Sequence, residues 1–523
     1  MEWIKGTWAL RKGPRRPPSA IGDLGSEADP DTVGLSGHAG RALLDCGWRL
    51  IEPSGEVAKD LEAGRRPPEA PEALRIYGDP HGLLVLATGR VTVLFDAGSS
   101  PREAVDRARA AGHEVVERYL WHPCALSLAV PRGQEPVAHA DRIQARLGAD
   151  IVSCRPEFLC YLPPSQTVSG YASEYKEQWQ WNNTGQSQGT GRAGKPGADI
   201  RVEKAWTLTK GKGMCIAVVD CGFRWKHNDL LRAVLSHSAT VHSGPESVSV
   251  SIGCVAMPSD EKNPHGTPCA SNAAAPGAAA GRICGAAPEA SLLLVAIESW
   301  ASGPGIAKAL HYAAFPACYQ FPAVPPSRIR GADVISFSRK LGGLEPGSAD
   351  CVKTALGDLS KGRDGLGIPF FYAAPHRKLD GDQSGFPVDF ATEHDVVLTI
   401  GATDRSDMAL RQGPKPEFVA PGESVFMADP RGEDMADYNS GTSFAAPVAA
   451  GVAALVLSKR PCLSVSELRR LMRASCDKVG SGVYGTDGYD TTERYGFGRI
   501  NAARAVGAVR PPPDWLSWTL PPH

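Results

Sequence analysis

The chain has 523 residues, with 56 lysine and arginine residues against 57 aspartate and glutamate residues, which gives a net charge of −1 at pH 7. This length exceeds one ordinary hydrophobic core, so two or three domains are expected. The balanced charge provides no electrostatic attraction toward nucleic acid or an anionic membrane, and we expect neither as a partner. We also expect no membrane-spanning segment.

The start of the chain and its cysteines bear on the cellular compartment. Residues 1–12 lack the apolar core and small-residue cleavage site of a secretory signal. The 13 cysteines are an odd number, and none has the Cys-x-x-Cys spacing of a zinc site. We therefore expect reduced, mostly buried thiols and, by default, a cytoplasmic location.

The first part of the chain divides into two segments. Residues 1–74 are rich in Pro, Gly, Arg and Glu, which predicts a flexible or partly ordered extension. In residues 75–163 the pattern is more regular, and Ser100 opens a helix with a capping box. The predicted elements alternate as strand 90–95, helix from 101, strands 113–119 and 125–130, helix 137–147 and strand 150–154. This order indicates a small ferredoxin-like α+β domain.

From residue 175 to residue 507, short buried strands alternate with helical stretches. The predicted strands are 215–220, 292–296, 334–337, 370–373 and 396–400. Such a pattern favours a doubly wound, mostly parallel sheet with helices on both faces. Two late helices, 464–476 and 501–506, are expected outside it, and residues 508–523 form a Pro-rich tail.

Ser443 precedes a long Ala-rich apolar run. This pattern predicts a loop that leads into a buried helix. We place both Ser443 and Pro447 in the first turn, where the missing N–H of a proline costs little. Free backbone N–H groups and the positive end of the helix dipole converge there. A serine at that point can lose its proton to a base while backbone donors hold an oxyanion, although a lone serine can also simply cap the helix.

Two further residues supply an acid and a base. Asp220 closes an apolar run and reads as the carboxyl end of a buried parallel strand, where α/β sheets place their sites. His265 stands at the mouth of an Ala-rich helix. The only histidine after Ser443 is His523, and the serine is not in a Gly-x-Ser-x-Gly turn, which excludes an α/β-hydrolase.

These motifs resemble the subtilisin-like serine proteases (subtilase family, peptidase S8 type). The resemblance is carried by Val-Val-Asp220-Cys-Gly, His265-Gly-Thr and Gly-Thr-Ser443-Phe-Ala-Ala-Pro, in the family's order of acid, base and nucleophile. It implies a subtilisin-like fold and a serine endopeptidase that cleaves protein or peptide substrates. In that mechanism His265 takes the proton of Ser443, Asp220 holds the imidazole, and no cofactor is needed.

A small domain ahead of a subtilase core resembles the family's propeptide, an intramolecular inhibitor. The strand near residues 158–162 would then enter the active cleft like a product, with autoprocessing between Tyr161 and Tyr175 in a monomeric protein. The alternative is an unrelated ferredoxin-like accessory module.

The stretch that matches the family's oxyanion asparagine departs from the pattern, because Pro375 and His376 stand there. A histidine ring N–H can donate, so His376 is the oxyanion candidate, and a slower or pH-tuned protease is expected. Loss of one such donor costs about 10²–10³ in rate. The alternatives are that His376 points elsewhere, or that the chain is a catalytically weak or inactive subtilase-fold peptide-binding module.

The substrate-binding strand of the family is matched by Ser338, Leu341 and Gly342, with Arg339 and Lys340 inserted. The two cations either favour acidic substrate residues or point to water.

Two further features concern ligands. The loop 275–283, where relatives bind calcium, has no side-chain oxygen, so we assign no metal site, and a structural calcium elsewhere stays unassigned. Cys269 is either a thiol that sensitises the site or a buried inert one.

Overall fold

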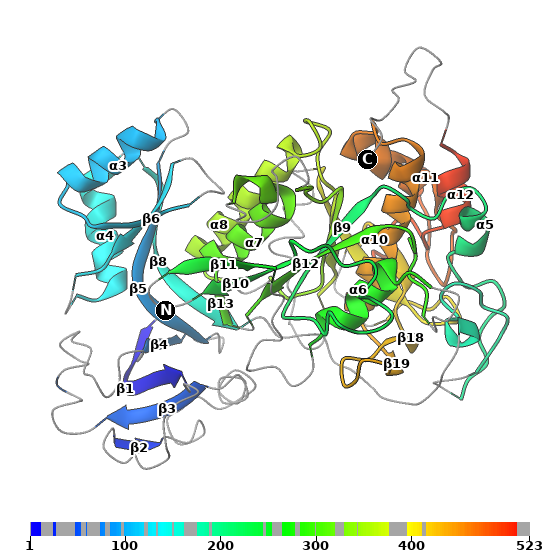
Figure 1. Cartoon of the computed structure of the whole chain (residues 1–523), viewed down its shortest axis with the longest axis horizontal. Coiled ribbons are helices and arrows are strands. Elements are labelled where there is room, and N and C mark those ends of the chain that lie inside the picture. The colour runs from blue at the N-terminus through cyan, green and yellow to red at the C-terminus, as the bar shows by residue number, and fades with distance from the viewer. Residues whose placement is uncertain are drawn as a thin grey trace.

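The structure, a computed structural model, describes residues 2–11, 25–27, 48–53, 59, 74–78, 84–95, 99–119, 124–131, 134–148, 151–161, 175–187, 191–243, 247–253, 264–277, 283–298, 300–319, 329–341, 344–375, 395–410 and 415–509. These residues form two large β-sheets, and the helices α7 (Gly303–Ala314) and α8 (Pro346–Asp358) lie between them (Figure 1).

The larger part of the chain is built on an eight-stranded sheet with the strand order β11-β10-β12-β9-β14-β15-β16-β17. Neighbouring strands run parallel except β10 and β11, which are antiparallel. The strands are β9 (Cys215–Asp220), β10 (Ala239–Ser243), β11 (Val248–Ile252), β12 (Ser291–Ile297), β14 (Val334–Phe337), β15 (Phe370–Ala373), β16 (Val397–Thr403) and β17 (Phe418–Pro421). The predicted doubly wound, mostly parallel sheet is confirmed.

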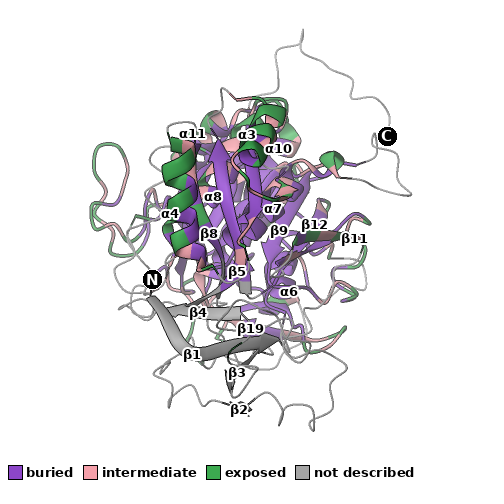
Figure 2. Ribbon diagram, turned by 90° about the vertical axis from the view of Figure 1, so that its left-hand side faces the viewer, coloured by how far each residue is buried: buried purple, intermediate pink, exposed green. Residues whose placement is uncertain are grey.

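Helices cover both faces of this sheet because its strands are apolar on both sides. In β9, Ile216 and Val218 pack into the cluster around α6 (Gly266–Ala274) and α10 (Thr442–Lys459). The alternate residues of the same strand face the opposite cluster, which contains α7 and α8. Figure 2 shows the strands β9 and β12 buried at the centre of the molecule.

The remaining elements of this part are short or lie outside. They are the helices α5 (Val202–Trp206), α11 (Val465–Ser475) and α12 (Ala502–Gly507), the 3₁₀ turns η3 (Tyr175–Glu177), η4 (Pro316–Cys318) and η6 (Leu359–Lys361), and the hairpin of β18 (Val425–Ala428) and β19 (Ala436–Asn439).

Helix α10 has the length and hydropathy of a membrane span, with 18 residues and a mean hydropathy of 1.4. However, 83% of that window is buried inside the protein. The helix packs on one face of the main sheet and contacts β14, β15, β16 and β17. Its apolar character therefore follows from its place in the core.

The N-terminal part forms a second, nine-stranded sheet. Its main path is β13-β8-β5-β4-β1-β3-β2, while β7 pairs with β5 and β6 pairs with β7. The elements are β1 (Glu2–Arg11), β2 (Gly25–Glu27), β3 (Trp48–Pro53), β4 (Leu74–Gly78), β5 (Leu84–Phe95), α3 (Pro101–Ala110), β6 (Val115–Arg118), β7 (Ala125–Ala129), α4 (Pro136–Leu147), β8 (Ile151–Tyr161) and β13 (Trp300–Ser302).

From β5 to β8 the elements follow one another as strand, helix, strand, strand, helix, strand. The capping box predicted at Ser100 is present, with Glu103 as its second member. Strands β1, β2 and β3 lie within residues 1–74, most of which are outside the described residues. The ferredoxin-like domain and its boundaries stay predictions.

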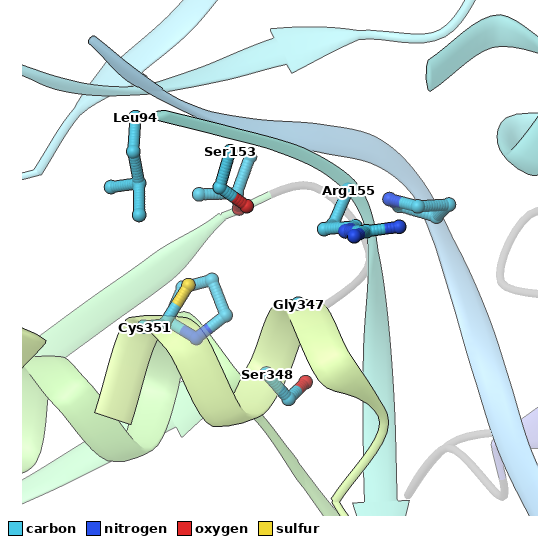
Figure 3. Close-up of a pocket in the computed structure, with 9 residues that line it drawn as sticks. Leu94, Ser153, Arg155, Gly347, Ser348 and Cys351 are labelled. Carbon is cyan, nitrogen blue, oxygen red and sulfur yellow. The ribbon is translucent and has the colours of Figure 1, made fainter. Parts of the chain in front are cut away.

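Several contacts join the N-terminal sheet to the rest, and two of them involve β8. Strand β13, which belongs to the chain between β12 and α7, pairs antiparallel with the end of β8, with Trp300 opposite Tyr161. Ser153 and Arg155 of β8 face Gly347 and Ser348 at the start of α8 (Figure 3). A Cβ on Gly347 would overlap the Cβ of Arg155, so only glycine allows this approach.

The packing of α10 on α6 gives a test of the core. A Cβ on Gly451 would stand 2.6 Å from Ala286 Cβ and 2.8 Å from the Ala273 carbonyl oxygen. We expect Gly451→Ala to destabilise the protein by about 1–3 kcal/mol, although alanine favours helix. Gly357→Ala in α8 is the control, because nothing lies within 4 Å of its added Cβ. It should leave stability unchanged or raise it by up to about 1 kcal/mol in denaturant unfolding. Equal effects of the two changes would contradict the packing.

Candidate active site

Asp220 and His265 are brought together at the carboxyl edge of the main sheet. Asp220 is the last residue of β9, and His265 immediately precedes α6. The His265 Nδ1 atom lies 3.1 Å from Asp220 Oδ1 and 3.0 Å from Asp220 Oδ2. Both side chains are buried, at 3% and 0% exposure.

The glycine after the histidine permits this approach. The Gly266 N–H donates to the Gly222 carbonyl at 3.1 Å. A Cβ on Gly266 would stand 2.6 Å from that oxygen and would overlap the ring of Phe223. The start of α6 can therefore touch the end of β9 only with glycine at this position.

Asp220 is held as a carboxylate. Burial alone would raise its pKa, but the charge and hydrogen bond of His265, the charge of Arg339 and the N–H of Cys221 together hold the pKa of Asp220 below its usual range. The Cys221 N–H donates to Asp220 Oδ1 at 2.8 Å. An ionised carboxylate on Nδ1 leaves the other ring nitrogen, Nε2, as the proton acceptor.

Ser443 is the second residue of α10, as predicted, and it exchanges two hydrogen bonds with the end of β14. The Ser443 hydroxyl donates to the Ser338 carbonyl at 3.2 Å, and the Ser338 hydroxyl donates to the Ser443 carbonyl at 2.8 Å. Ser338, predicted to bind substrate, thus lies against the serine backbone.

The predicted position of Pro447 is wrong. Helix α10 begins at Thr442, so Pro447 is the sixth residue and lies inside the helix. A residue with an N–H at that point would donate to the Ser443 carbonyl, four residues earlier. Because proline has none, that carbonyl accepts instead from Ser338 and, at 3.4 Å, from the Cys269 thiol.

Cys269 joins the serine to the histidine. Its sulfur lies 3.7 Å from His265 Nδ1, and the rings of His265 and Phe444 are 5.4 Å apart between centroids. The His265 Nε2 atom is buried and makes no hydrogen bond to the described residues. The histidine and the start of α10 are therefore neighbours, with Nε2 able to accept a proton when substrate aligns the hydroxyl.

Among the described residues, one group of side chains could hold a metal ion by its geometry. It consists of Asp220, His265 and Cys269, whose ligand atoms lie within 4.8 Å of one another. In this group Nδ1 of the histidine is already bonded to the carboxylate. Burial, with the charge of Asp220, raises the pKa of the Cys269 thiol well above its usual range. Its burial and raised pKa favour the second of the two sequence interpretations, and its reactivity stays a prediction.

Arg339 differs from the interpretation that the inserted cations point to water. It is 1% exposed, so it does not point to water. Its Nη1 atom lies 3.9 Å from Asp220 Oδ1, so its charge faces the buried carboxylate. Lys340 is half-buried. The insertion of Arg339 and Lys340 directly after Ser338 was the only sequence feature that pointed to this position. A long cationic side chain near glycines gave no indication that it would be buried.

The other predicted residues are placed in part. The Thr442 hydroxyl donates to the Ala374 carbonyl at 2.7 Å, so the chain after β15 passes the start of α10. Leu341 is buried in the core, and its N–H donates to the Tyr372 hydroxyl at 3.1 Å. His376 and Gly342 lie outside the described residues.

Comparison with known proteins gives the class to which this fold and site belong. The model of the subtilase family, Peptidase S8, matches residues 211–498. The match covers more than half of the chain, and the chain belongs to this family.

Two of the individual relatives share less than a third of their residues with this chain over the aligned parts. The chain is similar to the calcium-dependent protease of Nostoc sp., at 27% identity over 60% of this chain and 49% of the relative. It is similar to subtilisin DY of Bacillus licheniformis, at 29% identity over 57% of this chain and 92% of the relative. The chain thus spans about half the length of the calcium-dependent proteases that it matches.

Solved structures show the same fold. Fervidolysin from Fervidobacterium pennivorans, described as a keratinolytic enzyme related to subtilisin, aligns with a TM-score of 0.57 and 18% identity. The alignment covers 81% of this chain and 61% of that chain.

Cysteine alkylation checks the environment of the site. In the folded Ser443→Ala chain, iodoacetamide at pH 8 should modify Cys318 and Cys462, which are exposed, and leave Cys269 unmodified. The reason is that the raised pKa keeps Cys269 protonated and burial excludes the reagent. Peptide mass mapping measures this, with alkylation in denaturant as the control. Modification of Cys269 as fast as Cys462 would refute the buried thiol.

Proposed function

We propose that the chain is a serine endopeptidase that hydrolyses peptide bonds through Ser443, His265 and Asp220. The observation that carries the proposal is the buried contact of His265 with Asp220 at the edge where α10 begins with the serine. Family membership supports the same reaction class. Protein or peptide chains are the proposed substrates.

In the proposed reaction, Ser443 Oγ attacks the peptide carbonyl carbon while its proton passes to His265 Nε2. Asp220 stabilises the imidazolium that forms. The C–N bond then breaks as the imidazolium returns the proton to the leaving amine, and an acyl-enzyme remains. Water, activated by the same histidine, hydrolyses the acyl-enzyme. Backbone N–H groups at the start of α10 are available to the oxyanion, and His376 stays the side-chain candidate.

We further propose that the N-terminal segment is an intramolecular inhibitor. Support comes from the backbone pairing of Leu159, Cys160 and Tyr161 with β13. Strand β13 follows β12, in which Ala296 is opposite Asp220 in the parallel register. An extended segment that adds to a strand edge so close to the carboxyl end of the sheet occupies the position of a peptide substrate. The proposed cut lies after β8, between Tyr161 and Tyr175.

A side-chain contact strengthens this docking. Lys308 of α7 forms an ion pair with Glu117 of β6 and donates to the Val248 carbonyl. The Lys308 side chain is only 6% exposed, so loss of its partner would leave a cation in a poorly solvated position. Because Glu117 belongs to the N-terminal segment and Lys308 to the core, the pair contributes to their affinity.

Self-processing is the first test. Intact mass of the wild type should show loss of an N-terminal piece that ends between Tyr161 and Tyr175, while Ser443→Ala stays whole because it lacks the nucleophile. A fluorophosphonate probe should label the wild type covalently and leave Ser443→Ala unlabelled. If the wild type stays whole and is not labelled, the alternative of an inactive peptide-binding module, which the Pro375-His376 departure favours, replaces the proposal.

Inhibition in trans is the second test. Purified segment 75–163, added to the processed core, should slow fluorophosphonate labelling of Ser443. Glu117→Gln in the segment should weaken inhibition by roughly tenfold, because Lys308 loses its charged partner. Glu114→Gln removes the same charge from an exposed position and is the matched control. A segment that leaves the labelling rate unchanged would show that it is an accessory module.

A further inference from the structure

Arg339 is an arginine in an unusual place. Its side chain is 0% exposed and faces Asp220, itself 0% exposed, with 3.9 Å between Nη1 and Oδ1. Long cationic side chains ordinarily extend their charge into water, and a buried charge is costly unless an opposite charge is near. The burial of Arg339 is therefore tied to the carboxylate.

The position of Arg339 in the chain fixes this contact. It directly follows Ser338, whose hydroxyl and carbonyl both bond Ser443. The same segment thus bonds the serine through Ser338 and presents the guanidinium of Arg339 to Asp220. The carboxylate that the arginine faces is also the one that His265 Nδ1 bonds.

Several groups face Asp220 from the described elements around it. His265 precedes α6 and Cys269 lies within it. The Cys221 N–H follows the end of β9, and Arg339 comes from the chain after β14. Cys269 carries no charge, because burial raises its pKa well above the usual range. The charges that act on Asp220 are consequently those of Arg339 and of His265 when it is protonated.

We propose that Arg339 is a positioning residue that holds Asp220 ionised and keeps His265 in its neutral, proton-accepting form toward lower pH. A fixed cation close to the Asp–His pair opposes a second positive charge on the imidazole. The free enzyme must have neutral His265 to deprotonate Ser443, so this opposition extends activity on the acid side. The inference rests on the proposed roles of Asp220, His265 and Ser443.

The test is the pH dependence of the rate constant with which a fluorophosphonate labels Ser443 in the wild-type chain as purified. In Arg339→Met, which retains length without charge, the midpoint of the acid limb should rise by about 0.5 to 1.5 pH units. The midpoint rises because the guanidinium charge, which opposes protonation of the imidazole, is absent from this variant. Arg339→Lys should return the midpoint toward the wild-type value.

Two controls separate the possible outcomes. Lys361→Met removes the same charge from a side chain that is 72% exposed, and its midpoint should equal that of the wild type. The labelling rate constant refers to active molecules alone, so partial misfolding of Arg339→Met lowers the labelled amount but not the midpoint. If that variant does not fold at all, Arg339→Gln and Arg339→Lys compare neutral and charged side chains.

Three results would overturn the inference. The first is an unchanged midpoint in Arg339→Met and Arg339→Gln. The second is an equal shift in Lys361→Met, which would show a general charge effect. The third is altered preference between acidic and neutral peptide inhibitors with the midpoint unchanged, which would make Arg339 a substrate contact. Failure of the triad itself appears separately, as wild-type protein that no fluorophosphonate labels.

Discussion

The site depends on the carbonyl group of Ser443. Because Pro447 has no N–H, α10 cannot supply this oxygen with its usual donor, and a buried carbonyl without a partner would be costly. The hydroxyl of Ser338 and the thiol of Cys269 donate to it instead. One oxygen thus joins the serine helix, the end of β14 and the histidine helix. A proline that looks unfavourable in a helix interior therefore fixes three elements of the active site relative to one another.

The elements that meet at this oxygen also bring together the charged groups around Asp220. A carboxylate at the end of a fully buried strand is far from water, so its charge must be balanced within the protein. His265 and the Cys221 N–H provide part of that balance, as the sequence pattern indicated for the histidine. Arg339 adds a full charge from the segment that also binds the serine. The proposed proton transfer and the packing of the buried edge consequently depend on one small set of contacts.

The sequence predicted most of the buried apolar strands and the motifs. Strands β9, β12, β14, β15 and β16 were found to within a few residues, because continuous apolar runs between helical stretches are typical of buried parallel strands. The short parallel strand β17 was not predicted, although it is apolar and buried. Strands β10 and β11 were missed, since Ala-Thr-Val-His-Ser and Val-Ser-Val-Ser-Ile carry polar residues and lie at the sheet's edge. The burial of Arg339 was also missed, because only the tertiary position of Asp220 makes it favourable. Pro447 was wrongly placed in the first turn, because α10 begins at Thr442 and the proline is its sixth residue.

Strand β13 gives the N-terminal sheet its proposed regulatory meaning. It pairs with β8 through backbone groups, and such pairing accepts many side chains. A peptide substrate that used the same edge would need the same N–H and carbonyl groups, so β8 and substrate exclude one another. The N-terminal segment makes the contacts of Arg155 with Gly347 and of Glu117 with Lys308 in addition to this pairing, and a short peptide lacks them. In the proposed inhibition, these contacts favour β8 over a short peptide. If the segment is an inhibitor, cleavage after Tyr161 leaves them in place, and release of the segment must also break them.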